Sequence, residues 1–115
     1  MSGRSLTTYL RTHRMKRGLS QCELGQLFGI SKQSISRYEL GELPISGHVL
    51  IASELIFDEP YFELFPGFCA SVEARLNAHA SALLERLEQR GTTGSEKVIA
   101  LLRELPDRAR FSFTP

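Results

Sequence analysis

Basic side chains crowd the first third of this sequence of 115 residues. Residues 1–40 hold seven lysines and arginines against two acids, a net charge of +5, whereas the remainder holds seven basic and eleven acidic residues, a net charge of −4. The seven are Arg4, Arg11, Arg14, Lys16, Arg17, Lys32 and Arg37. Ammonium and guanidinium groups gathered in one segment can contact a polyanion such as a nucleic acid. An ordinary solvated face would carry the same charges, so charge alone does not decide between the two.

The residues that most often catalyse reactions or bind metals are scattered. His13, His48 and His79 are far apart in the sequence, have no nucleophile beside them, and accompany no glycine-rich phosphate loop. Cys22 and Cys69 lack the spacing of a zinc site or a disulfide framework, so we interpret them as free thiols. We therefore expect no enzymatic activity, no metal site and no cofactor.

The length suits one compact core with an appended piece. No apolar run approaches the length of a membrane span, and the N-terminal residues lack the apolar block of a signal peptide. We expect a cytoplasmic protein that does not contact a membrane.

Capping signals place two short helices in the basic segment. Ser20 and Glu23 form a capping box, so a helix should begin at Gln21, and Gly29 can adopt the left-handed conformation that ends it. Ser31 can cap a second helix, which Gly41 ends. Its inner face would carry Ile35, Tyr38 and Glu39, and its outer face Lys32, Gln33, Ser34, Ser36 and Arg37.

Further helices are predicted on either side of this pair. Periodicity indicates a helix over 6–17, another over 46–57, and a short turn or helix over 60–66. The expected apolar faces are Leu24, Leu27 and Phe28 in the second helix, and Val49, Leu50, Leu55 and Ile56 in the helix over 46–57.

Two glycines inside the helical pattern need a reason, because each costs about 1 kcal/mol of helix propensity relative to alanine. Two helices joined by a short turn cross steeply, which requires a small side chain at their contact and a positive φ in the turn. Gly25 meets the first requirement and Gly29 the second. An ordinary helical hairpin is the alternative, but the glycines, the capping box and the basic outer face together favour a helix-turn-helix.

From about residue 10 to 67, roughly half of the chain, the sequence resembles the helix-turn-helix family of phage Cro and repressor proteins, the Xre family of bacterial transcriptional regulators. The resemblance lies in "LRTHRMKRGLSQCELGQLFGISKQSISRYELGE" and in "ELFPG", which resembles the closing turn of such domains. It implies a lambda-repressor-like fold and a sequence-specific double-stranded DNA-binding regulator, without identifying its operator.

By this resemblance, residues 21–28 form the supporting helix and residues 32–40 the recognition helix, whose N-terminal part faces base edges in the major groove. The expected base-reading residues are Lys32, Gln33, Ser34 and Arg37. The expected phosphate-positioning residues are Gln21, Ser31 and Ser36. Arg14 and Glu39 match positions that form a structural ion pair in the family.

Several of these residues have a plain alternative. Ser31 caps its helix with or without DNA, and Gln21 and Ser36 could simply be solvated. Arg37 could pair with a nearby acid.

The sequence departs from the family after the recognition helix. Leu40 stands where the family often has a polar residue, and Glu42, which follows shortly after, would repel a phosphate. We therefore expect that the backbone amide near Gly41 makes the phosphate contact alone, or that the domain tilts on its site.

The second half of the chain has a different pattern. Apolar residues at steps of three and four over 69–90 predict an amphipathic helix, and Ser95 can cap a last helix that reaches about residue 105. These helices could extend the monomer core, or they could form a dimerisation element, because one recognition helix contacts few base pairs.

The sequence thus predicts an all-α protein with a lambda-repressor-like helix-turn-helix domain of about five short helices over 5–67. Two helices over 68–106 and a tail over 107–115 follow. The expected partners are double-stranded DNA and a second copy of the chain, and the expected role is a bacterial or phage-encoded repressor. The alternative is a protein-interaction module, an antitoxin or phage accessory protein, that binds a protein partner through residues 68–106.

Overall fold

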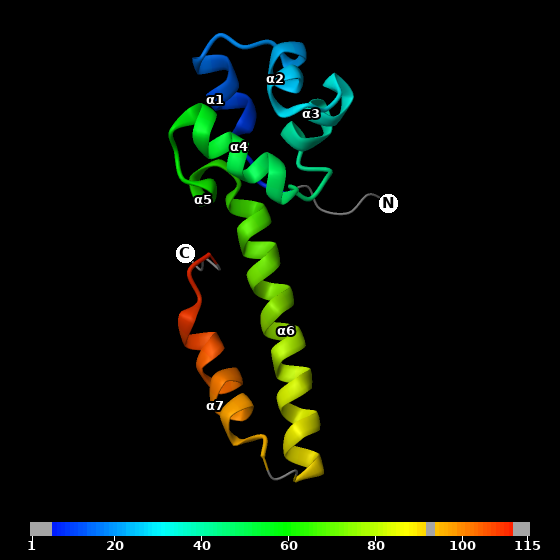
Figure 1. Ribbon diagram of the computed structural model, residues 1–115, viewed down its shortest axis with the longest axis vertical. Coiled ribbons are helices and arrows are strands. Elements are labelled where there is room, and N and C mark those ends of the chain that lie inside the picture. The colour runs from blue at the N-terminus through cyan, green and yellow to red at the C-terminus, as the bar shows by residue number, and fades with distance from the viewer. Residues whose placement is uncertain (1–5, 92–93, 112–115) are drawn as a thin grey trace. The chain divides into compact units, whose positions relative to one another are not determined.

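The computed structural model describes residues 6–91 and 94–111, which form seven α-helices and no strand (Figure 1). They are α1 (Leu10–Lys16), α2 (Gln21–Phe28), α3 (Lys32–Glu39), α4 (Gly47–Phe57), α5 (Tyr61–Leu64), α6 (Pro66–Arg90) and α7 (Glu96–Glu104). A 3-10 helix, η1 (Leu105–Arg108), follows α7. The prediction of an all-α protein, with five short helices followed by two more, is confirmed.

The chain divides into two compact units, residues 1–69 and residues 70–115, and the division falls inside α6. The first is called unit 1 and the second unit 2. The predicted DNA-binding domain begins at residue 5, which lies outside the described residues, as does Arg4. The structure also does not describe residues 112–115 of the predicted tail.

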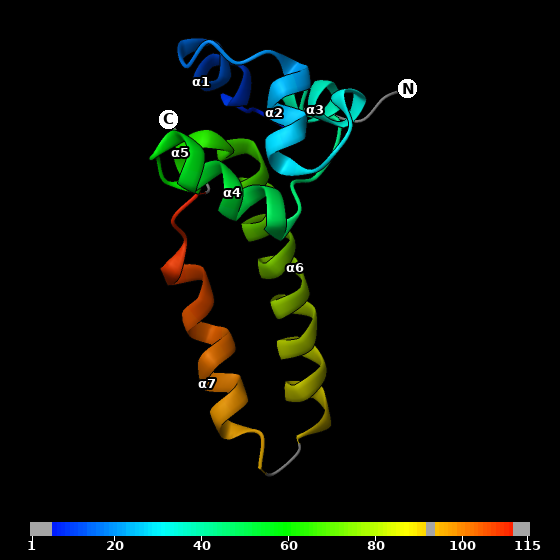
Figure 2. The same cartoon turned by 45° about the horizontal axis from the view of Figure 1, so that its top comes forward.

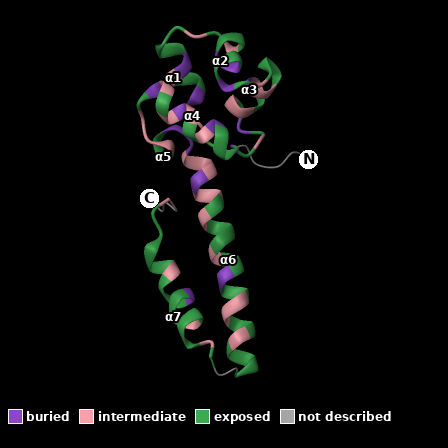
Figure 3. Ribbon diagram, viewed as in Figure 1, coloured by how far each residue is buried: buried purple, intermediate pink, exposed green. Residues whose placement is uncertain are grey.

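Unit 1 encloses an apolar core to which every one of its short helices or their connections contributes (Figure 3). Its nine buried members are Leu10, Leu24, Phe28, Ile35, Ile45, Val49, Phe57, Leu64 and Phe65. At about 1.5–3 kcal/mol for each large side chain transferred from water, this burial is the main force that holds the short helices together. None of them is long enough to persist alone.

Hydrogen bonds at the helix ends fix where the helices of unit 1 begin. The predicted capping box is confirmed, since the Glu23 amide donates to the Ser20 hydroxyl at 3.0 Å and the Ser20 amide donates to the Glu23 carboxylate at 2.8 Å. Ser31 caps α3 through the Ser34 amide at 3.1 Å. Each bond satisfies a first-turn donor that has no partner within its own helix.

The first helix is shorter than predicted, because it begins at Leu10 and not at Leu6. The preceding backbone is paired elsewhere: the Leu6 amide donates to the Gly41 carbonyl, and the Thr7 carbonyl accepts from the Gly67 amide, both at 2.9 Å. These long-range hydrogen bonds hold residues 6–9 against distant parts of unit 1, so the segment does not form a helix.

Two predicted core residues are exposed. Leu27 is 56% exposed. The buried side of α2 contains Leu24, Gly25 and Phe28, because Gly25 lies in the contact between α2 and the turn before α3, and Leu27 lies outside this side. Leu55 is 80% exposed. The buried side of α4 is centred on Ser53, between Val49 and Phe57, which leaves Leu55 on the opposite side.

Unit 2 consists of the larger part of α6 with α7 and η1, and α7 runs beside α6 in the opposite direction (Figure 2). Among its described residues only Ala80 and Leu102 are buried apolar side chains. Side chains from the two predicted apolar faces remain 42–50% exposed: Val72, Leu76, Val98 and Leu101. No helix in the described part of the chain is long and apolar enough to span a membrane.

The predicted helix ends in unit 2 are only partly right. The helix predicted over 69–90 begins earlier, at Pro66. Ser95 occupies the position before α7, as predicted, but its side chain makes no capping hydrogen bond. The last α-helix ends at Glu104, and the chain continues into η1.

Candidate nucleic-acid interface

The two glycines of the predicted helix-turn-helix do what the sequence suggested. Gly29 has φ +74° and ends α2 in the left-handed conformation, which costs a residue with a Cβ more than it costs glycine. A Cβ built on Gly25 would lie 2.8 Å from the Ile30 carbonyl oxygen, closer than real Cβ atoms approach. Gly25 therefore lets the turn lie directly on α2, and this contact sets the position of α3.

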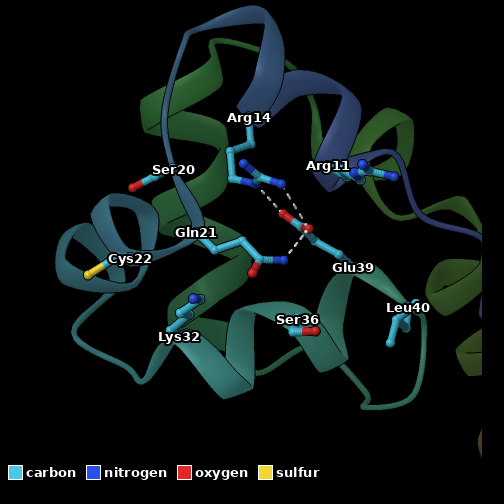
Figure 4. Close-up of a pocket in the computed structure, with 9 residues that line it drawn as sticks. All are labelled: Arg11, Arg14, Ser20, Gln21, Cys22, Lys32, Ser36, Glu39 and Leu40. Atoms are coloured by element: carbon cyan, nitrogen blue, oxygen red, sulfur yellow. Dashed lines mark hydrogen bonds and ion pairs between the residues drawn. The ribbon is translucent and has the colours of Figure 1, made fainter.

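Arg14 and Glu39 form the predicted ion pair between α1 and α3 (Figure 4). The Arg14 Nε donates to Glu39 Oε2 at 2.5 Å, and a second guanidinium nitrogen donates to Oε1 at 3.2 Å. The remaining guanidinium nitrogen donates to the Leu19 carbonyl at 2.8 Å. The side chains are only 10% and 4% exposed, so solvent screens this pair little.

Gln21 joins the same network from the start of α2. Its amide nitrogen donates to Glu39 Oε1 at 3.0 Å, and Figure 4 shows Glu39 held between Arg14 and Gln21. The three side chains tie α1, α2 and α3 together. The Gln21 side chain, predicted to position a phosphate, thus donates to a carboxylate of the protein in this structure.

The residues expected to read bases are not equally available. Lys32, Gln33 and Arg37 are exposed, whereas Ser34 is half-buried. The Ser31 hydroxyl lies 3.0 Å from the Ser34 hydroxyl and also accepts from the Ser34 amide. Of the expected phosphate-positioning residues, Ser31 is exposed and Ser36 is half-buried.

Arg37 lies near an acidic residue, Glu42, as the alternative interpretation of Arg37 expected. Its Nε lies 3.8 Å from Glu42 Oε1, and the two side chains are 58% and 53% exposed. An exposed pair at this distance is worth about 0–1 kcal/mol, so it leaves the guanidinium available to another acceptor.

An open concavity of about 590 Å³ lies where α1, α2 and α3 meet (Figure 4). Its lining residues are Arg11, Arg14, Ser20, Gln21, Cys22, Lys32, Ser36, Glu39 and Leu40. Arg11 is exposed and was not among the expected DNA contacts. The signal that could have found it is its position one helical turn before Arg14, the residue that faces α3.

Another basic residue of the first third has a structural use. Arg17 donates to the Phe57 carbonyl at 2.9 Å and so satisfies the last carbonyl of α4. Near the start of α4, a His48 ring nitrogen lies 2.7 Å from the Phe28 carbonyl at the end of α2. Within the described residues, no three His, Cys, Asp or Glu side chains converge as a metal site.

A family model described as a helix-turn-helix domain matches residues 5–52. The match contains α1, α2 and α3 and the first half of α4, and therefore every predicted site residue. No solved structure matches the chain significantly.

Curated relatives carry a similar description. A Thermococcus kodakarensis protein named as a candidate HTH-type transcriptional regulatory protein is 46% identical over 77 residues, 67% of this chain and 24% of that protein. A Pyrococcus furiosus protein with the same description is 44% identical over 64 residues, 56% of this chain and 20% of that protein. The chain thus spans about a quarter of the length of these relatives, or less. Both organisms are archaea, so the comparison does not support the expected bacterial or phage origin.

Proposed function

The chain belongs, through residues 5–52, to the helix-turn-helix domain family, and from this premise we propose that it is a sequence-specific double-stranded DNA-binding regulator of transcription. We further propose that it acts as a repressor, by occupying a site that other proteins would use. Its place of action would be the cytoplasm, where it would associate with the nucleoid.

One observation carries this proposal: α3 presents exposed polar and basic side chains while buried contacts fix its opposite face. Ile35 is fully buried, and Glu39 is held by Arg14 and Gln21. A helix of this kind can enter the major groove without first becoming ordered, so little conformational entropy is lost on binding.

The exposed residues suit base edges chemically. Gln33 can pair in bidentate fashion with adenine, and Arg37 with guanine. Lys32 can reach a base edge or a phosphate, and Ser34 is half-buried beside Ser31. The base preference of the site should therefore come mainly from Gln33 and Arg37.

The proposal is tested by selection of bound sites from a random pool of duplex DNA, using the wild-type chain and a Gln33→Ala/Arg37→Ala variant. We expect the wild type to enrich an inverted repeat with half-sites about one helical turn apart. Gln33→Ala alone should relax the preference at one base pair of each half-site by about 1–3 kcal/mol. If no motif is enriched, or if Gln33→Ala weakens all duplexes equally, the proposed recognition is wrong.

A specific observation in unit 2 favours a second element of the proposal, self-association through residues 68–106. Four large apolar side chains of this short hairpin stay 42–50% exposed, and only two apolar residues among its described positions are buried. A two-helix hairpin of this size does not bury enough apolar area to stabilise itself. A second copy of the hairpin could cover this area, and the resulting dimer would present two recognition helices to the two half-sites.

Sedimentation equilibrium of the full chain tests this element. Leu76→Glu should dissociate the dimer, because it places a carboxylate in the apolar contact. Gln89→Glu makes the same change of charge at an exposed position of α6 and should leave the dimer intact. A wild-type chain that is monomeric at all concentrations would contradict self-association. A protein partner that survives nuclease treatment would instead favour the interaction-module alternative.

A further inference from the structure

We propose that the concavity between α1, α2 and α3 binds one phosphate of the DNA backbone between Arg11 and Lys32, so that Lys32 contacts the backbone and does not read a base. The proposal rests on the proposed DNA-binding function and deepens it. It adds Arg11 to the interface and separates the exposed side of α3 into two rows with different tasks.

The two rows follow from which residues line the concavity. Lys32, Ser36 and Leu40 line it, and they are four residues apart. Gln33 and Arg37 are also four residues apart, but they do not line it. Residues at this spacing share one face of a helix, so the first row faces α1 and α2 while the second row faces away from them.

The charges around the concavity favour an anion. Glu39 is the one acidic lining residue, and Arg14 and Gln21 already occupy its carboxylate. Arg11 and Lys32 are exposed, and neither forms an ion pair with any residue in the described part of the chain. In Figure 4 they lie on opposite sides of the Arg14–Glu39 pair, one from α1 and one from α3. Two unpaired cations therefore remain at the mouth of the concavity.

The N-terminus of α2 adds to the positive electrostatic potential of the concavity. Ser20, Gln21 and Cys22 line the concavity, and the first amides of a helix lack acceptors inside the helix. The Glu23 amide is bound by Ser20, but those of Gln21 and Cys22 precede it in the first turn. These amides and the positive end of the helix dipole favour a phosphate at this position. The Gln21 side chain would then act by holding Glu39, and not by touching the phosphate.

Arg11→Gln tests the proposal, with Lys16→Gln as the matched control. Lys16 is exposed on the same helix, carries the same charge and does not line the concavity. We measure the affinity of the full-length variants for the selected duplex and for unrelated duplexes over a range of salt concentrations. Arg11→Gln should weaken binding to all duplexes by a similar factor and reduce the slope of log K against log salt by about 1. Lys16→Gln should change that slope by clearly less.

Lys32→Gln gives the second test, because the two possible roles of Lys32 predict different results. A phosphate contact predicts a uniform loss of affinity and a smaller salt slope, whereas a base contact predicts a loss confined to one base pair of each half-site. Equal salt slopes for Arg11→Gln and Lys16→Gln, or a base-specific effect of Lys32→Gln, would overturn this proposal and leave the proposed function standing. A wild-type chain that binds no duplex would overturn both.

Discussion

The two units of this chain contain a similar proportion of apolar residues but bury them to very different extents. The described part of unit 1 buries nine large or medium apolar side chains in one cluster, whereas that of unit 2 buries only Ala80 and Leu102. The core of unit 1 includes Ile35 and so holds α3 in place. In the described part of unit 2, four large apolar side chains stay exposed, and the proposed self-association would cover them.

Ion pairs give the same contrast and the largest predicted effect. Arg14 and Glu39 are 10% and 4% exposed, whereas Arg103 and Glu88 of unit 2 are 62% and 43% exposed. Glu39→Ala should lower the free energy of unfolding of unit 1 by about 3 kcal/mol, because it leaves a buried guanidinium without its counter-ion. Glu88→Ala, the control in unit 2, should cost less than about 1 kcal/mol. Urea unfolding followed by far-UV circular dichroism measures both.

Equal losses for these two variants would remove the contrast between the units. A double variant, Arg14→Met/Glu39→Leu, sharpens the interpretation, because a matched apolar pair should recover most of the stability lost in Glu39→Ala. Failure to recover would mean that the network contributes more than charge compensation.

The next largest effect is expected at the contact between α2 and the turn. Gly25→Ala should cost about 2 kcal/mol, since its Cβ would meet the Ile30 carbonyl oxygen and push α3 from its position. Gly47→Ala is the control, because Gly47 also lies in a helix but has no atom within 4 Å of a built Cβ. Thermal unfolding of the two variants tests the difference. A Gly25→Ala variant as stable as Gly47→Ala would mean that the turn can move freely.

The smallest predicted effect is a gain in stability. Ser53 is fully buried at the centre of the inner face of α4, and its hydroxyl has no hydrogen-bond partner among the described residues. Ser53→Ala should raise the free energy of unfolding by about 1 kcal/mol, because a buried unpaired hydroxyl is costly and alanine favours the helix. A loss of stability in urea unfolding would show that the hydroxyl is paired in solution.

Local signals in the sequence predicted the helices well because the responsible contacts are local. The capping box of Ser20 and Glu23 and the positive φ of Gly29 each involve residues within a few positions of one another. Arg14 and Glu39 are 25 positions apart, so periodicity could not predict their ion pair. The prediction came from the family resemblance, which carries information on long-range contacts.

The sequence-based predictions were wrong where contacts with distant segments determine the local structure or burial. Residues 6–9 were predicted as helix, but Gly41 and Gly67 hold this backbone from across unit 1. Leu55 was assigned to the core on hydrophobicity, whereas the buried side of α4 is centred on the polar Ser53.

The count of basic residues also could not predict which of them make structural contacts. It could not distinguish Arg17, which caps α4, from Arg11, which lines the concavity, because both are simply basic residues of the first third.

The most direct test of the central claim, that DNA binds over α3 and the adjoining concavity, is the rate at which Cys22 is alkylated. Cys22 is an exposed thiol that lines the concavity, and Cys69 is buried and serves as an internal reference. We predict that a saturating selected duplex slows alkylation of Cys22 severalfold and leaves that of Cys69 unchanged. If the duplex is bound and Cys22 reacts as fast as in the free protein, DNA lies on another face and the account is wrong.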